Sequence, residues 1–313
     1  MKIICIYNYK GGVAKTTGCI SIASTMSMPP LNKKVLLVDA DPSCNLTQFF
    51  EDSIGAKEIS QPNLFDFFSG KADTDELIRT FTYYRYPGDK FKVIQKAEAE
   101  PQDLEHNFIY TKVQYEGDDP ADAELETVDI EAESMPTTAS RYCTVSLIPG
   151  APDLARTNFD NKMNFLRDLL EKYEDNFDYV LIDCPPENMP ISDCILRASD
   201  CAVVPMGAQS DSINGFEKMI RAIKDVHDQG YKIRFLGTYF AIVGQNESIP
   251  RKLMAGMKEA AAGTDYMFDT MIKRDALADK CRYAGIPLPV YRRSAPLAKQ
   301  YDALTQEILS RLE

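Results

Sequence analysis

The stretch Lys10–Thr17, KGGVAKTT, constrains the fold of this chain more than any other part of its sequence. It follows an apolar run at residues 2–7, KIICIY, and precedes an apolar, helix-like stretch from Ile20 to Met28. At such a strand-to-helix turn, backbone N–H groups and the positive end of the helix point together at an anion. Gly11 and Gly12 let the backbone come close to a phosphate, because they have no Cβ. The sequence therefore predicts a phosphate-binding loop formed by Gly11, Gly12, Val13, Ala14, Lys15, Thr16 and Thr17.

Two side chains of this loop suit a nucleotide bound with magnesium. Lys15 can reach the β- and γ-phosphate oxygens, and the hydroxyl of Thr16 can ligate the metal. The general pattern G-x-x-x-x-G-K-[ST] nevertheless fails here, because Tyr9 and Ala14 replace its two defining glycines. If position 14 requires a positive φ, alanine costs on the order of 1 kcal/mol there.

Continuous apolar runs predict six strands, at 2–7, 35–39, 143–148, 179–183, 201–205 and 235–240. These runs lack the alternation of half-exposed strands, which is typical of a parallel sheet covered on both faces. Helical patterns lie between and after them, at 154–174, 192–198, 213–226, 249–261 and 297–312. Strands that alternate with helices predict an α/β fold, namely a doubly wound, mostly parallel sheet with helices on both faces.

The net charge of −12 is concentrated in one segment. Residues Glu98 to Glu133 hold thirteen acids and one base, Lys112, which leaves 34 acids and 34 bases in the remainder. We interpret 84–139 as an acidic insertion within a single domain spanning 1–313. So many carboxylates are costly to bury, so we expect the insertion to be exposed or partly disordered. Two roles stay open: a solvated insertion, or an element that binds a partner or modulates contact with nucleic acid.

Several classes of protein are disfavoured by composition. The eight cysteines are scattered without a C-x-x-C pair and there are two histidines, which argues against a zinc or iron–sulfur site within one chain. No apolar run approaches the ~18 residues of a membrane span, and the N-terminus lacks the pattern of a signal peptide. The sequence therefore predicts a cytoplasmic protein without a membrane partner.

The phosphate loop closely resembles the deviant Walker A motif, K-G-G-x-x-K-[ST], of the ParA/MinD superfamily. NYKGGVAKTT is similar to the NQKGGVGKTT of the ParA branch, with Ala14 as the main departure. Two further strings agree in type and order: DADPSCNLT at 39–47 resembles D-x-D-P-Q-x-N-L-T, and FDYVLIDCPP at 177–186 is similar to the Walker B string. The resemblance implies that the chain binds ATP and Mg²⁺, with Thr16, Asp39 and Asp183 holding the metal directly or through water.

The resemblance also implies catalytic roles for Lys10, Lys15 and Asp41. Asp41 would position the attacking water. Lys10 is the signature lysine of the family, which crosses a dimer interface to phosphates held by the other subunit, so that ATP is enclosed in a homodimer. A cation supplied by another chain stabilises the charge that develops during phosphoryl transfer. For Asp39 the residues leave a second role open, that of capping the following helix.

Most of the chain takes part in this resemblance. LIPGAPDLA at 147–155 and ASDCAVVPM at 198–206 are similar to family strings, and 268–291 resembles the C-terminal block that completes the adenine pocket. Lys273 departs from the pattern, because the family usually has proline there, and this puts recognition of the base in doubt. The insertion at 84–139 lies outside the common pattern.

The resemblance implies an ATPase of plasmid or chromosome partition. With ATP and magnesium it would dimerise and bind DNA non-specifically, which would make it nucleoid-associated. Its hydrolysis of ATP would be slow alone, and a ParB-like, centromere-bound partner would stimulate hydrolysis and so release the protein from DNA. Phosphate contacts by basic residues make such binding strongly salt-dependent. We expect these contacts in the C-terminal half, where the candidates are Lys218, Arg221, Lys224, Lys273, Arg274, Lys280, Arg282, Arg292 and Arg293.

An alternative is a ParA-like positioner of a protein cargo, or a regulatory ATPase that does not bind DNA, because its nucleotide site would look the same. A MinD-like membrane ATPase fits less well, since it needs a basic amphipathic helix at the C-terminus. The last fourteen residues of this chain, QYDALTQEILSRLE, contain a single basic residue, Arg311. An iron-protein reductase also fits less well, because Cys44 and Cys184 belong to no cluster pattern.

Overall fold

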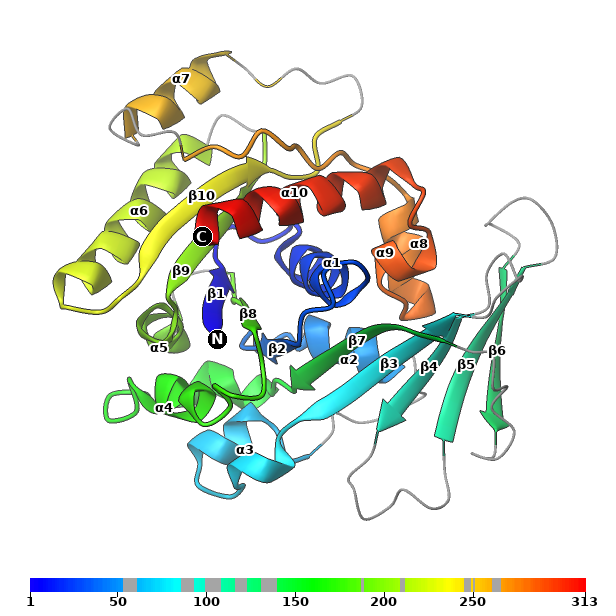
Figure 1. Ribbon diagram of the computed structural model, residues 1–313. Helices are drawn as coiled ribbons and strands as arrows, with labels where there is room; N and C mark the ends of the chain where they lie inside the picture. Colours follow the sequence, from blue (N-terminus) through cyan, green and yellow to red (C-terminus); the bar gives the residue numbers. More distant parts are fainter. Residues whose placement is uncertain are drawn as a thin grey trace.

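The computed structural model describes residues 1–52, 61–85, 93–98, 108–115, 123–130, 140–186, 189–208, 212–244, 249, 251–260 and 266–313. An eight-stranded sheet runs through the described part in the order β10-β9-β1-β8-β2-β7-β3-β4 (Figure 1). Its parallel strands are β1 (Lys2–Ile6), β2 (Val35–Asp39), β7 (Ser140–Ile148), β8 (Tyr179–Asp183), β9 (Cys201–Met206) and β10 (Arg234–Phe240). The antiparallel pairs β7–β3 and β3–β4 extend one edge, with β3 at Arg79–Arg85 and β4 at Val93–Glu98.

Helices cover both faces of the sheet, each over its own hydrophobic core. The first core contains buried residues of α1 (Lys15–Ser27), α2 (Asn45–Asp52), α8 (Leu277–Ala284), α9 (Leu288–Tyr291) and α10 (Pro296–Leu312). The second contains buried residues of α3 (Leu64–Phe68), α4 (Phe165–Glu171), α5 (Pro190–Ala198), α6 (Ser212–Asp228) and α7 (Arg251–Ala260). Short 3₁₀ turns lie at Thr74–Glu76 and Pro152–Arg156.

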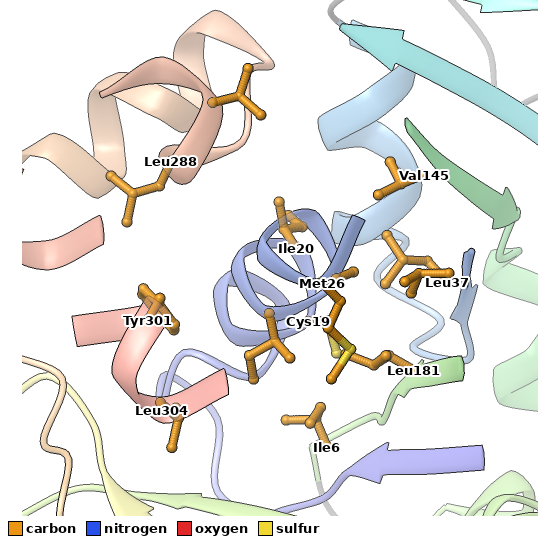
Figure 2. Close-up of a cluster of buried hydrophobic side chains, with 14 of the residues drawn as sticks. Ile6, Cys19, Ile20, Met26, Leu37, Val145, Leu181, Leu288, Tyr301 and Leu304 are labelled. Carbon is orange, nitrogen blue, oxygen red and sulfur yellow. The ribbon is translucent and has the colours of Figure 1, made fainter. Parts of the chain in front are cut away.

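Strand alternation explains how one apolar run serves two cores. In β2 every residue is buried, and successive side chains point to opposite faces. Leu37 therefore packs in the first core, while Leu36 and Val38 pack in the second. Figure 2 shows the first core, in which α1 contributes Cys19 and Ile20 between the sheet and α10. The predicted doubly wound, mostly parallel fold is confirmed.

One helix prediction was wrong in extent. The sequence predicted one helix at 154–174. The structure has the 3₁₀ turn Pro152–Arg156 at the start of this range and, after a break, the short helix α4 (Phe165–Glu171). The backbone N–H of Asp160 donates to Oδ1 of Asn158 at 2.8 Å. Such a local side-chain bond offers the backbone an alternative to the helix and favours a turn. The apolar residues therefore keep a helical spacing along the whole range, although the polar residues form a turn that interrupts the helix.

The acidic insertion contains strands that its composition did not predict. Besides β4, it holds β5 (Phe108–Tyr115) and β6 (Ala123–Ile130), which pair antiparallel in a separate two-stranded sheet. The predicted exposure of its side chains concerns residues outside the described part of the structure. In the described residues as a whole, no helix has the length and apolar character needed to cross a membrane.

Candidate nucleotide-binding site

The loop between β1 and α1 has the strained geometry that a phosphate loop requires. Gly12 has φ 72° and Ala14 has φ 59°, ψ 37°, which is the left-handed region. The backbone N–H of Gly18 donates to the carbonyl of Ala14 at 2.9 Å, so the helix begins directly at this residue. Because position 14 does have a positive φ, alanine there carries the strain of about 1 kcal/mol that the sequence predicted.

The ammonium group of Lys15 is held inside this loop. Its side chain is buried, and Nζ donates to the carbonyl oxygens of Asn8 and Lys10, each at 3.1 Å. The carboxamide of Asn8 fixes the loop in turn, because Nδ2 donates to the carbonyl of Pro205 at 2.5 Å and Oδ1 accepts the N–H of Lys10 at 2.8 Å. An ammonium has three donors, so one remains for a ligand.

Asp183 ends β8 beside the first turn of α1. Its Oδ2 accepts a hydrogen bond from Oγ1 of Thr16 at 2.6 Å, while its buried Oδ1 has no hydrogen-bond partner in the described structure. Burial and then the charge of Asp39 raise the pKa of Asp183 well above its usual value, against the opposing bond from Thr16. A buried carboxylate is costly without a compensating charge. A hydroxyl and an unsatisfied carboxylate oxygen are hard ligands that fit magnesium.

Asp39 ends β2 and is bonded to the start of α2. Its Oδ2 accepts from the backbone N–H of Thr47 at 2.8 Å and from Oγ1 of Thr47 at 2.7 Å, and its Oδ1 accepts the N–H of Asp41 at 3.2 Å. Burial raises the pKa of Asp39 to about 7, although the bonds from Thr47 oppose the shift. The helix-capping role considered from the sequence is thus present, and a role toward magnesium stays a prediction.

Asp41 and Lys10 lie at the mouth of the loop. The carboxylate of Asp41 is buried, and its Oδ1 accepts the N–H of Ser43 at 2.9 Å, while Oδ2 accepts no hydrogen bond from the described residues. Lys10 is half-buried, next to the exposed Gly11 and Gly12. The structure therefore brings together all the residues predicted for phosphate and magnesium, on the carboxyl ends of β1, β2 and β8.

A pocket of about 400 Å³ opens beside the loop, between α1, α2 and α8. One side carries the backbone of the loop and Asp41, and the other carries apolar groups that include Phe49, Cys281 and Leu288. Arg282 of α8 lines the pocket as well, and its Nη2 donates to Oδ1 of Asn45 at 3.1 Å, which connects α8 to α2. A pocket with polar groups at one end and apolar walls suits a nucleotide.

Sequence reasoning missed several residues of this site. The backbone carbonyl of Asn8 accepts a hydrogen bond from Lys15, and the hydroxyl of Thr47 donates to Asp39. The backbone N–H of Gly150 donates to that hydroxyl of Thr47. Arg282 lines the pocket, but the sequence analysis considered it only as a DNA contact. Gly150 gave no signal because its neighbour Asp39 is far away in the sequence. Thr47 and Asn8 flank the two motifs, so their proximity to the site could have been foreseen.

Gly150 has no room for a side chain. A Cβ added there would lie 2.8 Å from the carbonyl oxygen of Asp39 and 2.9 Å from its Cγ. We expect Gly150→Ala to lower the free energy of unfolding by about 1–3 kcal/mol, the usual cost of overpacking, and to weaken ATP binding by displacing Asp39. Chemical denaturation and calorimetric titration measure the two effects. Gly215→Ala is the control, because nothing lies within 4 Å of an added Cβ there. Wild-type stability of Gly150→Ala would contradict the packing argument.

The basic residues predicted to contact DNA do not form one face. Lys218, Arg221 and Lys224 are exposed on α6, which packs on the second core. Arg292 and Arg293 are exposed in the turn between α9 and α10, which pack on the first core. Figure 1 shows α6 at the left of the view and α9 on the other side of α1, next to α8. The remaining candidates lie before or within α8, namely the exposed Lys273, Arg274 and Arg282 and the half-buried Lys280.

Comparison with known proteins identifies the family. A family model described as an AAA domain matches residues 1–90 and 101–235. The chain belongs to this family. A relative named chromosome partitioning protein ParA, from Caulobacter vibrioides, is 25% identical over 315 residues, with 99% of this chain and 95% of the relative covered. Together these matches show that the chain is a member of the ParA/MinD superfamily of partition ATPases.

Solved structures agree with this fold. The ATP complex of a Cyanothece McdA variant is 20% identical with a TM-score of 0.65, and the match covers 99% of this chain and 96% of that one. Cobyrinic acid a,c-diamide synthase from Mycobacterium smegmatis, with a bound ATP analogue and magnesium, is 19% identical with a TM-score of 0.65, covering 100% and 96%. Both structures hold a nucleotide, and the second also holds magnesium, on the fold that this chain shares.

Proposed function

We propose that this chain is a magnesium-dependent ATPase that dimerises with ATP, binds DNA non-specifically in that state, and is released when a ParB-like, centromere-bound partner stimulates hydrolysis. The buried ammonium of Lys15 carries the proposal, because it lies in a strained loop next to the unsatisfied oxygen of Asp183. A buried cation and a buried, partnerless carboxylate oxygen fit phosphate oxygens and a metal ion.

Each polar group of the site has a distinct task in this proposal. Thr16 and Asp183 would hold magnesium, which when bound neutralises the charge of the β- and γ-phosphate oxygens. Lys15 would bind the same oxygens from the other side, and Asp41 would orient the attacking water through Oδ2. Lys10, which is half-buried and precedes the exposed Gly11 and Gly12, would act on the nucleotide of a second subunit.

Partition activity is supported by the relative named ParA, which covers nearly the whole chain. It would place the protein in the cytoplasm, on the nucleoid. The alternative, a positioner of a protein cargo or a regulatory ATPase without DNA binding, shares the nucleotide site and differs only in what the ATP form binds. Affinity for DNA therefore decides between the two functions.

Three measurements on the purified protein test the proposal. We expect phosphate release from ATP that requires magnesium, a doubled mass by light scattering with ATP but not ADP, and co-sedimentation with double-stranded DNA only in the ATP state. Binding of ATP should also raise the thermal stability, because a ligand that binds only the folded state stabilises it. Hydrolysis and dimerisation without DNA binding would favour the alternative, and absence of hydrolysis would contradict the assigned site.

A further inference from the structure

A cluster of basic residues lies at the C-terminal end of α1, away from the phosphate loop at its N-terminal end. The turn after α1 carries Lys33 and Lys34. The turn between α9 and α10 lies against it, because Nη2 of Arg293 donates to the carbonyl of Pro29 at 3.0 Å. We call the group formed by Lys33, Lys34, Arg292 and Arg293 the α1-end patch. Its two halves are far apart in the chain, so only the fold brings them together.

The cations of this patch are not neutralised. Lys34, Arg292 and Arg293 are exposed and Lys33 is half-buried. Within the described ranges none of the four side chains forms an ion pair. The exposed carboxylate of Asp178 also lies there, and its Oδ2 accepts the backbone N–H of Lys34 at 2.8 Å, so the patch holds one negative charge beside its four positive ones. Four unpaired cations on one surface create a positive potential that attracts a polyanion.

The bases on α6 differ in this respect. Arg221 lies 3.8 Å from Glu217, and the exposed side of the same helix carries two more carboxylates, Asp225 and Asp228. Alternating charges of both signs cancel at the distance of a Debye length, about 8–10 Å at physiological salt. The α6 helix is therefore a weaker candidate for binding a polyanion than the α1-end patch.

A groove of about 550 Å³, with polar and apolar groups in its lining, adjoins the patch at Lys33 and Lys34. Lys33 and Lys34 line it together with neutral hydrogen-bonding groups, and no aspartate or glutamate contributes to its lining in the described structure. The neutral groups include the amides of Asn32 and Asn176, and the hydroxyls of Ser27 and Thr80, which are hydrogen-bonded to Ser24 and Ser146. Hydroxyl and amide side chains commonly donate to the phosphate oxygens of DNA beside lysine and arginine.

We infer that the α1-end patch and its groove form the surface that binds the phosphate backbone of double-stranded DNA. The inference rests on the proposed function, which supplies DNA as the partner, and it assigns the contact to Lys33 and Lys34 as well as to Arg292 and Arg293. DNA is a linear polyanion, and each phosphate that is neutralised releases counterions.

The patch can be altered without touching the nucleotide site. The 13 residues of helix α1 separate the patch from the phosphate loop. At 1.5 Å per residue the helix is about 20 Å long. The backbone N–H of Lys33 donates to the carbonyl of Met26, and that of Lys34 donates to Asp178. Side-chain substitution leaves both bonds in place, so the turn keeps its structure.

The test compares Lys33→Gln/Lys34→Gln with Lys218→Gln/Arg221→Gln, which removes two cations from α6. DNA affinity of the full chain is measured with ATP and magnesium as a function of salt, and ATP hydrolysis without DNA is measured in parallel. For the first variant we expect the slope of log K against log salt to become less negative by about 1.8. Two phosphate contacts are lost, and each contributes about −0.9 to the slope. For the α6 variant we expect the wild-type slope, and for both variants wild-type hydrolysis.

Two outcomes overturn the inference in distinguishable ways. If the Lys33→Gln/Lys34→Gln variant keeps the wild-type slope, or if both variants lose slope equally, DNA binds but the assigned surface is wrong. If the wild-type chain hydrolyses ATP and binds no DNA at any salt concentration, the DNA part of the proposed function fails and the inference fails with it.

Discussion

Replacing Lys15 with alanine should weaken ATP binding by a large factor. The ammonium is buried and held by the carbonyl oxygens of Asn8 and Lys10, so it is oriented before the nucleotide arrives. Truncating one partner of a buried, hydrogen-bonded charge pair costs about 2–5 kcal/mol. This corresponds to roughly a 30-fold to several-thousand-fold increase in Kd. Isothermal titration calorimetry of the variant with ATP and magnesium measures the effect.

The control for this experiment is Lys172→Ala, which removes an exposed lysine just after α4. It should bind ATP as the wild-type chain does. Circular dichroism of Lys15→Ala verifies that the fold is retained, because loss of folding would also remove binding. A folded Lys15→Ala chain with wild-type ATP affinity would show that the loop between β1 and α1 is not the phosphate site.

Asp41→Ala should keep ATP and stop hydrolysis, so that an ATP-bound dimer accumulates. The substitution removes a carboxylate whose Oδ2 is left for a water, while Lys15 and the loop backbone remain to bind the phosphates. Loss of general-base or water-positioning groups typically costs about 10²–10⁴-fold in rate. Light scattering in ATP and magnesium measures the dimer, and release of phosphate measures the rate. Asp41→Asn serves as a variant of equal size.

Lys10→Ala should give the opposite pattern, in which nucleotide binding is retained while dimer formation and hydrolysis are lost. The reason is that Lys10 would serve the nucleotide of the second subunit rather than its own. A monomeric Asp41→Ala chain, or one that hydrolyses ATP at the wild-type rate, would remove the role assigned to Asp41. A Lys10→Ala chain that still dimerises with ATP would remove the role assigned to Lys10.

The parallel strands could be predicted because burial on both faces leaves a continuous apolar run, as in β2 and β8. β3 could not be found by that criterion, because Thr80 and Thr82 alternate with the buried Phe81 and Tyr83. The hydroxyls of Thr80 and Thr82 pair with those of Ser146 and Thr144 on β7, each at 3.1 Å. Such an alternating strand has only half the apolar signal of a buried one.

The loop and the carboxylates of the candidate nucleotide site lie in three motifs, each a continuous segment of the sequence, so their assignment to one site could be made from the sequence and stays a prediction. What escaped prediction depends on contacts between distant segments, as with Gly150 against Asp39 and Arg282 against Asn45. The arrangement of the basic residues could not be predicted for the same reason. Lys33 and Lys34 are an ordinary pair in the sequence, and only the contact of Arg293 with Pro29 joins them to a larger positive surface.

The pairing of β3 with β7 also bears on how this chain could acquire new properties. Arg85 and Ser140 are opposite each other in that pair, so the chain leaves the β3–β7 pair and returns to it at neighbouring positions, with β4 of the same sheet in between. Arg85 is separated from β1 by β7, β2 and β8, and Ser140, the first residue of β7, is separated from it by β2 and β8. A segment of almost any length joined at these two points preserves the strand register and the loop geometry. Evolution could therefore exchange one recognition module for another at this edge while the phosphate loop and its carboxylates stay unchanged.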